Sequence, residues 1–500
     1  MEDRQQWGSR YGFILAAVGS AIGLGNIWRF PAVAYENGGG AFFIPYLIAL
    51  LTAGIPLLIL EFTLGHKYRG SAPLSYFRLH KNAEWLGWWQ VFVAFVISTY
   101  YAVIIAWALK YSIYSLNLTW GDKPSDFFYG EVLQLSAKPG EVGGLVPGVV
   151  IALLIVWVVT LLVLYKGVSK GIERFNKIFL PALVIMFLFI VIRAVTLEGA
   201  GQGLNTFFSP DWSMINNGKV WVAAYGQIFF SLSIAFAIMV TYSSYLPKKS
   251  DINNNAFITG FANSGFELLA GIGVFAALGF MAMQQGMSVD EVVKGGIGLA
   301  FEVFPAIINE FPGFNGFFGT MFFLTLVFAG MTSLISIVET YVAALQDKFG
   351  ISRTKAVLMG GGVASVISLL FATKGGLYML DITDYFINNF GITLAGLVEV
   401  VLIAWFFKQL KGLQDHANVI SDLRTGLWWK ICLGVVTPIL LGYMMFDNIK
   451  QNIAENYGGY PTGLVVTYGL AVAVGVIVLG FLLSLVKRKT NAVQEKREVS

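Results

Sequence analysis

Long apolar segments alternate with short polar ones along the chain. Each apolar segment approaches the roughly 20 residues that a helix needs to cross the hydrocarbon core of a bilayer. The pattern predicts an all-α integral membrane protein, embedded in lipid, with about twelve membrane-spanning helices. Their expected bounds are 12–35, 41–64, 88–115, 146–164, 175–196, 221–246, 255–283, 316–346, 354–372, 379–407, 429–446 and 463–486.

The composition strengthens this interpretation. Hydrophobic residues make up 56% of the chain, the mean hydropathy is +0.70, and only 12% of the residues are charged. A soluble domain carries about twice that share of charge. No separate soluble domain is visible, and the net charge of +4 gives no reason to expect nucleic-acid binding.

Positive charge is unevenly divided between alternate loops. About 24 of the 33 Lys and Arg residues fall in one set of loops and in the basic segment 487–500. Lys and Arg near the ends of spans are retained on the cytoplasmic side. We therefore expect a multi-pass protein of the cell membrane with both termini in the cytoplasm.

Residues that enzymes use are scarce in the spans. The three histidines, His66, His80 and His416, are expected in cytoplasmic loops, and Cys432 is the only cysteine. The chain lacks the short sequences typical of zinc proteases, serine hydrolases and P-loop ATPases. An enzyme is disfavoured, and a thiolate metal cluster is excluded.

Polar side chains within the spans are the remaining source of chemistry. A charged residue at bilayer depth costs about 2.5 kcal/mol or more, so each is a functional hypothesis. A lone Ser or Thr says less, because hydroxyls also bond their own helix backbone. The polar residues in or beside spans are Asn26, Arg29, Glu61, Gln227, Ser231, Ser233, Asn263, Glu267, Thr332, Ser333, Glu339 and Asp384.

The first span contains residues that a regular helix avoids. Its segment GSAIGLGNIWRFP starts at Gly19 and includes Gly23 and Gly25, and a glycine inside a helix costs about 1 kcal/mol relative to alanine. These glycines allow the helix to unwind, which frees carbonyls to face a cation and amides to face an anion. The segment predicts a cradle for an ion and a substrate.

Oxygen donors recur on two later spans. Asn263 and Glu267 are four residues apart and share one helix face, and the segment AGMTSL places Ala329, Thr332 and Ser333 together. Oxygen donors without sulfur or imidazole suit a hard cation of low charge, and sodium is the obvious one.

Several longer motifs occur in a fixed order. They are GLGNIWRFP at 23–31, NGGGAFFIPY at 37–46, GIPLLILE at 54–61, STYYAVIIAW at 98–107, KGIERFNKI at 170–178, GQIFFSLSIAF at 226–236 and FAGMTS at 328–333. Over nearly the whole chain, these motifs resemble the neurotransmitter:sodium symporters, and in particular the bacterial amino-acid transporters of that family.

The resemblance implies a fold of two five-helix repeats with opposite topology, with helices 1 and 6 broken at the midplane. The repeats would span 1–196 and 218–411, followed by helices 11 and 12 at 428–486. A monomer or weak homodimer is expected. Without the resemblance, the sequence gives no reason to expect a broken sixth helix.

The resemblance also implies two sodium sites. The first would use Ala21, Asn26, Ser231 and Asn263, and the second Gly19, Ile22, Ala329, Thr332 and Ser333. The carboxylate of an amino-acid substrate would share the first sodium.

The same resemblance implies a substrate site. The substrate carboxylate would meet the Gly25 amide and the Tyr101 hydroxyl, and its ammonium would meet the Ser233 hydroxyl and carbonyls near Ala21 and Phe230. Family members that carry monoamines have an aspartate where this chain has Gly23, which favours an amino acid. The expected side-chain pocket is apolar and suits a neutral hydrophobic side chain; it comprises Ile97, Phe230, Phe236, Leu334 and Ile337. Ser231 and Ser333 are expected to contact the substrate as well as sodium, which gives twelve substrate-site residues with Gly23 included.

Glu267 is expected to replace a chloride ion. Two sodium ions in a low-dielectric site need compensating negative charge, and the substrate supplies only one carboxylate. Chloride-dependent family members have a serine at this position and bind chloride near the groups that match Tyr46, Gln227, Ser231 and Asn263. We therefore expect no chloride requirement. Because a buried unpaired carboxylate tends to neutralise itself, Glu267 is also a candidate to return a proton outward.

Two gates are expected from the resemblance. Outside the substrate, Arg29 and Asp384 would form an ion pair with Phe236 as an aromatic lid. At the cytoplasmic side, the residues would be Arg4, Trp7, Tyr245 and Asp347, with Arg4 paired to Asp347.

One departure and two alternatives remain open. Ala235 and Ala237 stand where the family often has glycine, and their methyl groups would narrow the pocket or stiffen the break. An ion channel would need a continuous pore lined by polar rings or carbonyls, and a proton-coupled amino-acid carrier of the same fold is the second alternative.

Overall fold

A computed structural model describes residues 5–489 of the chain. Every extended regular element in these residues is a helix. Ten helices there are long and apolar enough to span a membrane. Their bounds are Gly40–Tyr68 (with α4, Phe43–Ala49, and α5, Ile55–Tyr68), Lys81–Asn117 (with α7, Glu84–Tyr114), Pro147–Tyr165 (α9), Val168–Val195 (with α10, Arg174–Val195), Ile252–Gln285 (α14), Asn315–Phe349 (α18), Arg353–Ala372 (with α19, Arg353–Ala356, and α20, Gly362–Ser368), Gly376–Phe406 (with α21, Gly376–Phe386, and α22, Thr393–Val401), Leu427–Gly459 (with α24, Leu427–Ile431, and α25, Thr437–Ala454) and Thr462–Leu485 (with α26, Thr462–Leu464, and α27, Ala471–Leu485).

Two further apolar segments are interrupted. The first consists of α1 (Arg10–Ala21), α2 (Leu24–Trp28) and α3 (Phe30–Glu36), and it bends by 54° at its break; counting it as one span raises the number to eleven. The second consists of α12 (Gly218–Ser231) and α13 (Ile238–Ser243), separated by residues 232–237. Together with the ten continuous helices, these account for the apolar segments expected from the sequence, and helices 1 and 6 are both broken.

The break between α12 and α13 is built without glycine. Ser233, Ala235 and Ala237 have φ values of 54°, 58° and 62°, and the left-handed conformation costs an L-residue about 1–2 kcal/mol. Contacts from other helices offset this cost: the Ala235 N–H donates to Glu61 Oε1 at 2.6 Å, and Ser233 Oγ donates to the Ser20 carbonyl at 3.2 Å.

The interrupted helices lie in the centre of the bundle. α1 packs against α10, α14 and α18, whereas α13 packs against α5 and α18. Of the most apolar stretch of α18, 83% is buried inside the protein, compared with 28% for the span containing α27. The broken helices are therefore surrounded by protein, and α27 faces outward toward lipid.

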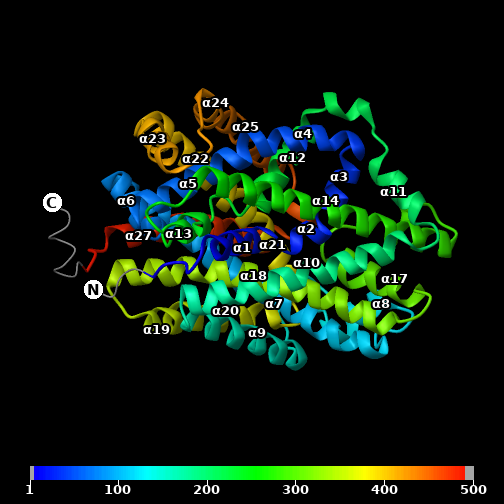
Figure 1. The fold of residues 1–500 in the computed structure, drawn as a ribbon. Helices are drawn as coiled ribbons and strands as arrows, with labels where there is room; N and C mark the ends of the chain where they lie inside the picture. The colour runs from blue at the N-terminus through cyan, green and yellow to red at the C-terminus, as the bar shows by residue number, and fades with distance from the viewer. Residues whose placement is uncertain (1–4, 490–500) are drawn as a thin grey trace.

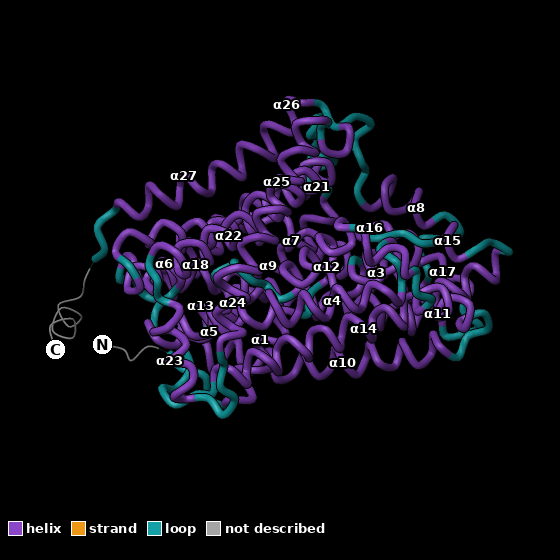
Figure 2. The backbone as a smooth tube through the Cα atoms, turned by 90° about the horizontal axis from the view of Figure 1, so that it is seen from above, coloured by secondary structure: helices purple, strands orange, loops and turns teal. Residues whose placement is uncertain are grey.

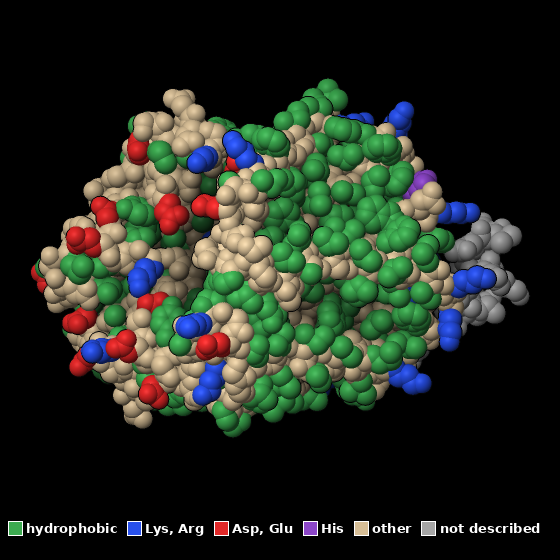
Figure 3. All heavy atoms as spheres, turned by 180° about the vertical axis from the view of Figure 1, so that it is seen from behind, with side chains coloured by type: hydrophobic (Ala, Val, Ile, Leu, Met, Phe, Trp, Pro, Cys, Tyr) green, Lys and Arg blue, Asp and Glu red, His purple; other side chains and the backbone are tan. Residues whose placement is uncertain are grey.

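The two ends of the bundle differ. The described part of the chain begins and ends at one end of the bundle, called here the end of the termini. The short helices α8 (Pro124–Asp126), α11 (Ala200–Phe208), α15 (Val289–Val292) and α17 (Phe304–Glu310) lie at the other end (Figures 1 and 2). Figure 3 shows a band of hydrophobic side chains, with Lys and Arg gathered beside the termini and Asp and Glu gathered at the opposite end. A hydrophobic band between charged ends is the surface of a multi-pass membrane protein.

The expected bounds agree with the observed helices to within a few residues in most spans. The clearest difference is the eleventh span, which was expected to end at 446 and continues to Gly459. Its last part contains Asp447, Lys450 and Gln451, so this helix continues beyond the apolar stretch that sequence hydropathy detects. The division into repeats at 1–196 and 218–411 stays a prediction.

Candidate substrate and ion site

A cavity of about 560 Å³ lies between the interrupted helices and α7, α18 and α21. It reaches residues 295–297, which lie between α15 and α17 at the end away from the termini. Eleven of the twelve residues predicted to contact substrate line it: Ala21, Gly23, Gly25, Ile97, Tyr101, Phe230, Ser231, Ser233, Phe236, Ser333 and Ile337. The structure therefore brings these residues together around one cavity, and their contact with substrate stays a prediction.

Leu334, the twelfth predicted residue, does not line the cavity. It is fully buried within α18, whereas Ser333 and Ile337 face the cavity. Those two residues are four apart and share a helix face, while the residue after Ser333 points about 100° away.

Gly23 leaves space at the centre of the site. A Cβ atom there would lie 3.2 Å from Tyr101 Oη and 3.3 Å from Ser333 Oγ. Tyr101 Oη accepts a hydrogen bond of 3.3 Å from the Leu24 N–H. A Cβ at Gly25 would meet no atom within 4 Å. The broken turn of helix 1 thus exposes backbone to the cavity with no side chains in between.

The side chains predicted for the first sodium site form one hydrogen-bonded cluster. Asn26 Nδ2 donates to Asn263 Oδ1 at 2.8 Å, and Asn263 Nδ2 donates to Ser231 Oγ. The Gly23 N–H donates to Asn26 Oδ1 at 2.9 Å. The cluster joins α2, α12 and α14 and is buried, and its oxygens are all neutral.

The residues predicted for the second sodium site lie where α1 ends beside α18. Thr332 Oγ1 donates to the Ala329 carbonyl at 3.0 Å, and Ser333 Oγ donates to the Ser20 carbonyl at 3.3 Å. α1 ends at Ala21, with Ile22 as its cap. The last carbonyls of a helix have no partner within it and carry its negative dipole end, which suits a cation.

Glu267 lies one turn from Asn263 and is fully buried. Tyr46 Oη donates to Glu267 Oε2, and Gln227 Nε2 donates to Oε1 at 2.6 Å. The three residues come from α14, α4 and α12, and neither hydrogen-bond donor is a cation. The residues expected at the chloride position therefore do gather around a carboxylate.

The expected outer ion pair is not formed among the described residues, although both partners line the cavity. The exposed Arg29 places its guanidinium carbon 4.7 Å from the centre of the Phe230 ring. Asp384 instead accepts hydrogen bonds from Tyr100 Oη at 2.7 Å and Asn388 Nδ2 at 2.8 Å. In this conformation each of the two residues therefore has other partners, and Arg29 is exposed.

The opposite side is sealed by Trp7, which is only 3% exposed. Its Nε1 donates to the Tyr242 carbonyl at 2.8 Å, and its ring contacts Phe13, Tyr242 and Tyr245 edge-on. Tyr245 Oη donates to Glu339 at 2.7 Å. The indole therefore fills the space between α1 and α13.

The proposed partner of Asp347, Arg4, lies outside the described residues. Asp347 itself accepts a hydrogen bond of 2.7 Å from the Ser71 N–H.

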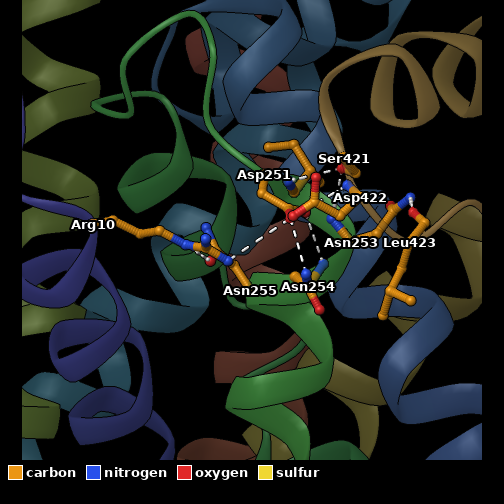
Figure 4. A network of polar contacts seen from close by, with 9 residues as sticks. Arg10, Asp251, Asn253, Asn254, Asn255, Ser421, Asp422 and Leu423 are labelled. Atoms are coloured by element: carbon orange, nitrogen blue, oxygen red, sulfur yellow. Dashed lines mark hydrogen bonds and ion pairs between the residues drawn. The ribbon is translucent and has the colours of Figure 1, made fainter.

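A second contact, between Arg10 of α1 and the start of α14, holds α1 in place at the end of the bundle where the described chain begins (Figure 4). Arg10 donates from Nε to Asn255 Oδ1 at 3.0 Å and lies 3.8 Å from Asp251, at the start of α14. Burial alone would raise the pKa of Asp251, but hydrogen bonds from Asn254 and from the Asp422 N–H outweigh it and hold that pKa below its ordinary value. The carboxylate is therefore ionised at neutral pH and retains Arg10.

Comparison with known proteins identifies the architecture. The model of the "Sodium:neurotransmitter symporter family" matches residues 4–123 and 117–490. The chain belongs to this family. Its members are secondary transporters, so the protein is a sodium-dependent transporter and not an enzyme.

Relatives of this symporter match over most of their length. An uncharacterized sodium-dependent transporter of Methanocaldococcus jannaschii is 44% identical over 98% of this chain and 99% of its own. The human sodium- and chloride-dependent neutral and basic amino acid transporter B(0+) is 30% identical over 92% of this chain and 82% of its own. The crystal structure of MhsT in complex with L-phenylalanine has a TM-score of 0.75 and 32% identity, and the match covers 89% of this chain and 100% of that chain.

Two features of the symporter escaped the sequence analysis. Glu399 and Gln90 are fully buried and joined by a hydrogen bond of 2.9 Å, and Asn176 is buried beside α1. Glu399 stands alone in an apolar run, so the rule applied to other intramembrane charges would have found it. Asn176 lies at the start of the expected span 175–196, between Arg174 and Lys177, which were counted among the charges of the adjoining loop.

Replacing Trp7 with alanine should shift the symporter toward opening at the end of the termini. A loss of 1–2 kcal/mol of packing would change the population ratio by about 5- to 30-fold. A Cys432→Ser background with Ser336→Cys, a buried position between α1 and α18, reports the opening as a faster reaction with maleimide. Trp7→Phe is the control. An unchanged rate in Trp7→Ala would contradict the sealing role.

Proposed function

We propose that this symporter carries a neutral, hydrophobic amino acid together with sodium, without chloride, by alternating access. The observation that carries the proposal is the chemistry of the cavity. Its inner wall combines exposed backbone at the break of helix 1 with Ile97, Phe236 and Ile337. Backbone groups match the charged ends of an amino acid, and the apolar wall matches its side chain.

The comparisons support an amino acid as the substrate class. MhsT, whose structure resembles this one, was crystallised with L-phenylalanine, and one human relative is named as a transporter of neutral and basic amino acids. This chain has no acidic residue at position 23, where an amine without a carboxylate would need a partner. The cavity-facing apolar residues favour an uncharged side chain.

Two sodium ions are proposed per cycle, one at each oxygen cluster. The first cluster contains Asn26 and Asn263, and the second contains Thr332 and the end of α1. Both clusters consist of neutral oxygens, so they favour a monovalent cation over a divalent one, whose sites are usually rich in carboxylates.

Chloride independence rests on Glu267. The human relative is named as sodium- and chloride-dependent, so this proposal separates the chain from it. A fixed carboxylate held by Tyr46 and Gln227 supplies the compensating charge from within the protein. When sodium leaves, the same carboxylate is proposed to take up a proton and return it outward as the carrier resets.

The proposed orientation places the termini in the cytoplasm of a cell-membrane protein. The gathering of Lys and Arg at that end supports it. The cavity then faces outward, and Trp7 closes the cytoplasmic side. We propose that the transporting unit is one chain, as a monomer or a weak homodimer. A channel is disfavoured because this closure interrupts any continuous pore.

The substrate class can be tested by binding. Purified protein in sodium should be stabilised against heat by neutral hydrophobic amino acids, and by none of the charged ones. We expect the melting temperature to rise with L-phenylalanine, L-leucine or a similar amino acid, and the rise to vanish when choline replaces sodium. Stabilisation by a monoamine alone, or by lysine as strongly as by leucine, would contradict the proposed class.

A further inference from the structure

A fully buried asparagine of α10 faces the second oxygen cluster. Asn176 is 0% exposed, and its Nδ2 donates to the Ile172 carbonyl at 3.0 Å. Its Oδ1 has no hydrogen-bond partner among the described residues. Because the amide nitrogen is engaged by its own helix, the oxygen must point away from it.

The oxygen points at the last turn of α1. A Cβ atom built on Gly19 would lie 2.5 Å from Asn176 Oδ1 and 3.5 Å from Thr332 Cβ. The amide oxygen and Thr332 therefore flank the same side of α1. Only glycine fits at position 19, because any side chain would collide with the amide oxygen.

A buried carbonyl oxygen without a donor costs about 1–3 kcal/mol, and a cation beside it would remove that cost. The neighbouring groups are the carbonyls at the end of α1 and the Thr332 hydroxyl, which are neutral oxygen donors as well. We propose that Asn176 Oδ1 is a further ligand of the second sodium ion, contributed by α10. This inference rests on the proposed function.

The position of Asn176 also connects ion binding with opening. Glu173, three residues before Asn176 and at the N-cap of α10, accepts hydrogen bonds from the Gly8 N–H at 2.5 Å and from Ser9 Oγ at 2.8 Å. The segment before α1 is thus anchored to the turn that carries the ligand. When α1 moves away from α10, the sodium ion loses the Asn176 oxygen. The affinity of the second site for sodium then falls as the protein opens at the end of the termini, where the ion is released.

The test uses sodium alone as the probe. The melting temperature of the full-length protein is measured against sodium concentration, with choline keeping the ionic strength constant. Asn176→Ala should raise the sodium concentration for half-maximal stabilisation by roughly tenfold, the lower range seen when a metal site loses a supporting group. Asn176→Asp retains an oxygen and should stay near the wild-type value or below it.

Asn253→Ala is the matched control. Asn253, at the start of α14, is also fully buried, and its Oδ1 also has no hydrogen-bond partner among residues 5–489. Its Nδ2, however, donates hydrogen bonds to Asn418 Oδ1 and to the Leu423 carbonyl. This change should lower the melting temperature without moving the sodium midpoint. If Asn176→Ala does not fold, Asn176→Ser, which is too short to reach the ion, gives the same comparison.

An unchanged sodium midpoint in Asn176→Ala or Asn176→Ser would overturn the role of Asn176 while leaving the proposed function standing. A wild-type protein that sodium does not stabilise at all would overturn the proposed function itself. A midpoint shifted equally in Asn253→Ala would show a general loss of stability and would also overturn the assignment.

Discussion

Replacing Glu267 with serine should make transport depend on chloride. The wild-type carboxylate is buried between Tyr46 and Gln227, one turn from Asn263 in the first oxygen cluster. Without it, the two sodium ions and the one substrate carboxylate of the proposed cycle would leave an uncompensated positive charge. Because removing one partner from a buried set of charges costs about 3–5 kcal/mol, uptake by Glu267→Ser without chloride should fall about a hundredfold or more.

The measurement is uptake into proteoliposomes with chloride replaced by gluconate. The wild type should be indifferent to the replacement, whereas Glu267→Ser should regain activity when chloride is restored. Glu267→Gln is the matched control, since its larger amide fills the space and should stay inactive in both media. A chloride requirement in the wild type, or an active Glu267→Ser that ignores chloride, would contradict the role of Glu267.

Asp384→Asn should slow uptake strongly while weakening equilibrium binding less. Arg29 and Asp384 face the same open cavity but hold other partners, Phe230 for the first and Tyr100 with Asn388 for the second. We expect them to pair only when the cavity closes over the substrate. Loss of one charge would then destabilise the closed state, and a cost of about 1.4 kcal/mol already corresponds to a tenfold decrease in its population.

Asp381→Asn provides the comparison for this outer gate. Asp381 also lines the cavity from α21, but its carboxylate is held by Tyr457 Oη at 3.0 Å and Tyr460 Oη at 2.8 Å. Its replacement should change uptake less than Asp384→Asn does. Equal effects of the two changes, or unchanged kinetics in Asp384→Asn, would mean that Arg29 and Asp384 do not act as a gate.

Sequence alone predicted those parts of the structure that local chemistry determines. The apolar runs indicated the spans, and the glycine-rich segment from Gly19 indicated a break in helix 1, which the structure places at residues 22–23, with Gly19 inside α1 and Gly25 inside α2. The break before α13 could not be seen in this way, because Ala235 and Ala237 favour a helix locally. Their left-handed conformation depends on contacts such as the Glu61 hydrogen bond, which comes from a distant part of the chain.

Around the cavity, too, some features follow from the local sequence and others depend on contacts between distant parts of the chain. Helix periodicity and family motifs named side chains that lie together in the two oxygen clusters, whereas Leu334 lies one position away from the cavity-facing side of α18. The sequence named Arg29 and Asp384 as partners without indicating in which conformation they meet. It also passed over Asn176, whose significance depends on the approach of α10 to Gly19.

The most direct test of the account is sodium-driven uptake by the purified protein in proteoliposomes. With sodium outside only, a radiolabelled neutral amino acid chosen from the binding panel should accumulate inside to a concentration above that outside. The accumulated amino acid should leave again when an ionophore dissipates the sodium gradient. Entry that stops at equal concentrations, or accumulation that continues unchanged without a sodium gradient, would contradict the proposed function as a sodium-coupled amino-acid symporter.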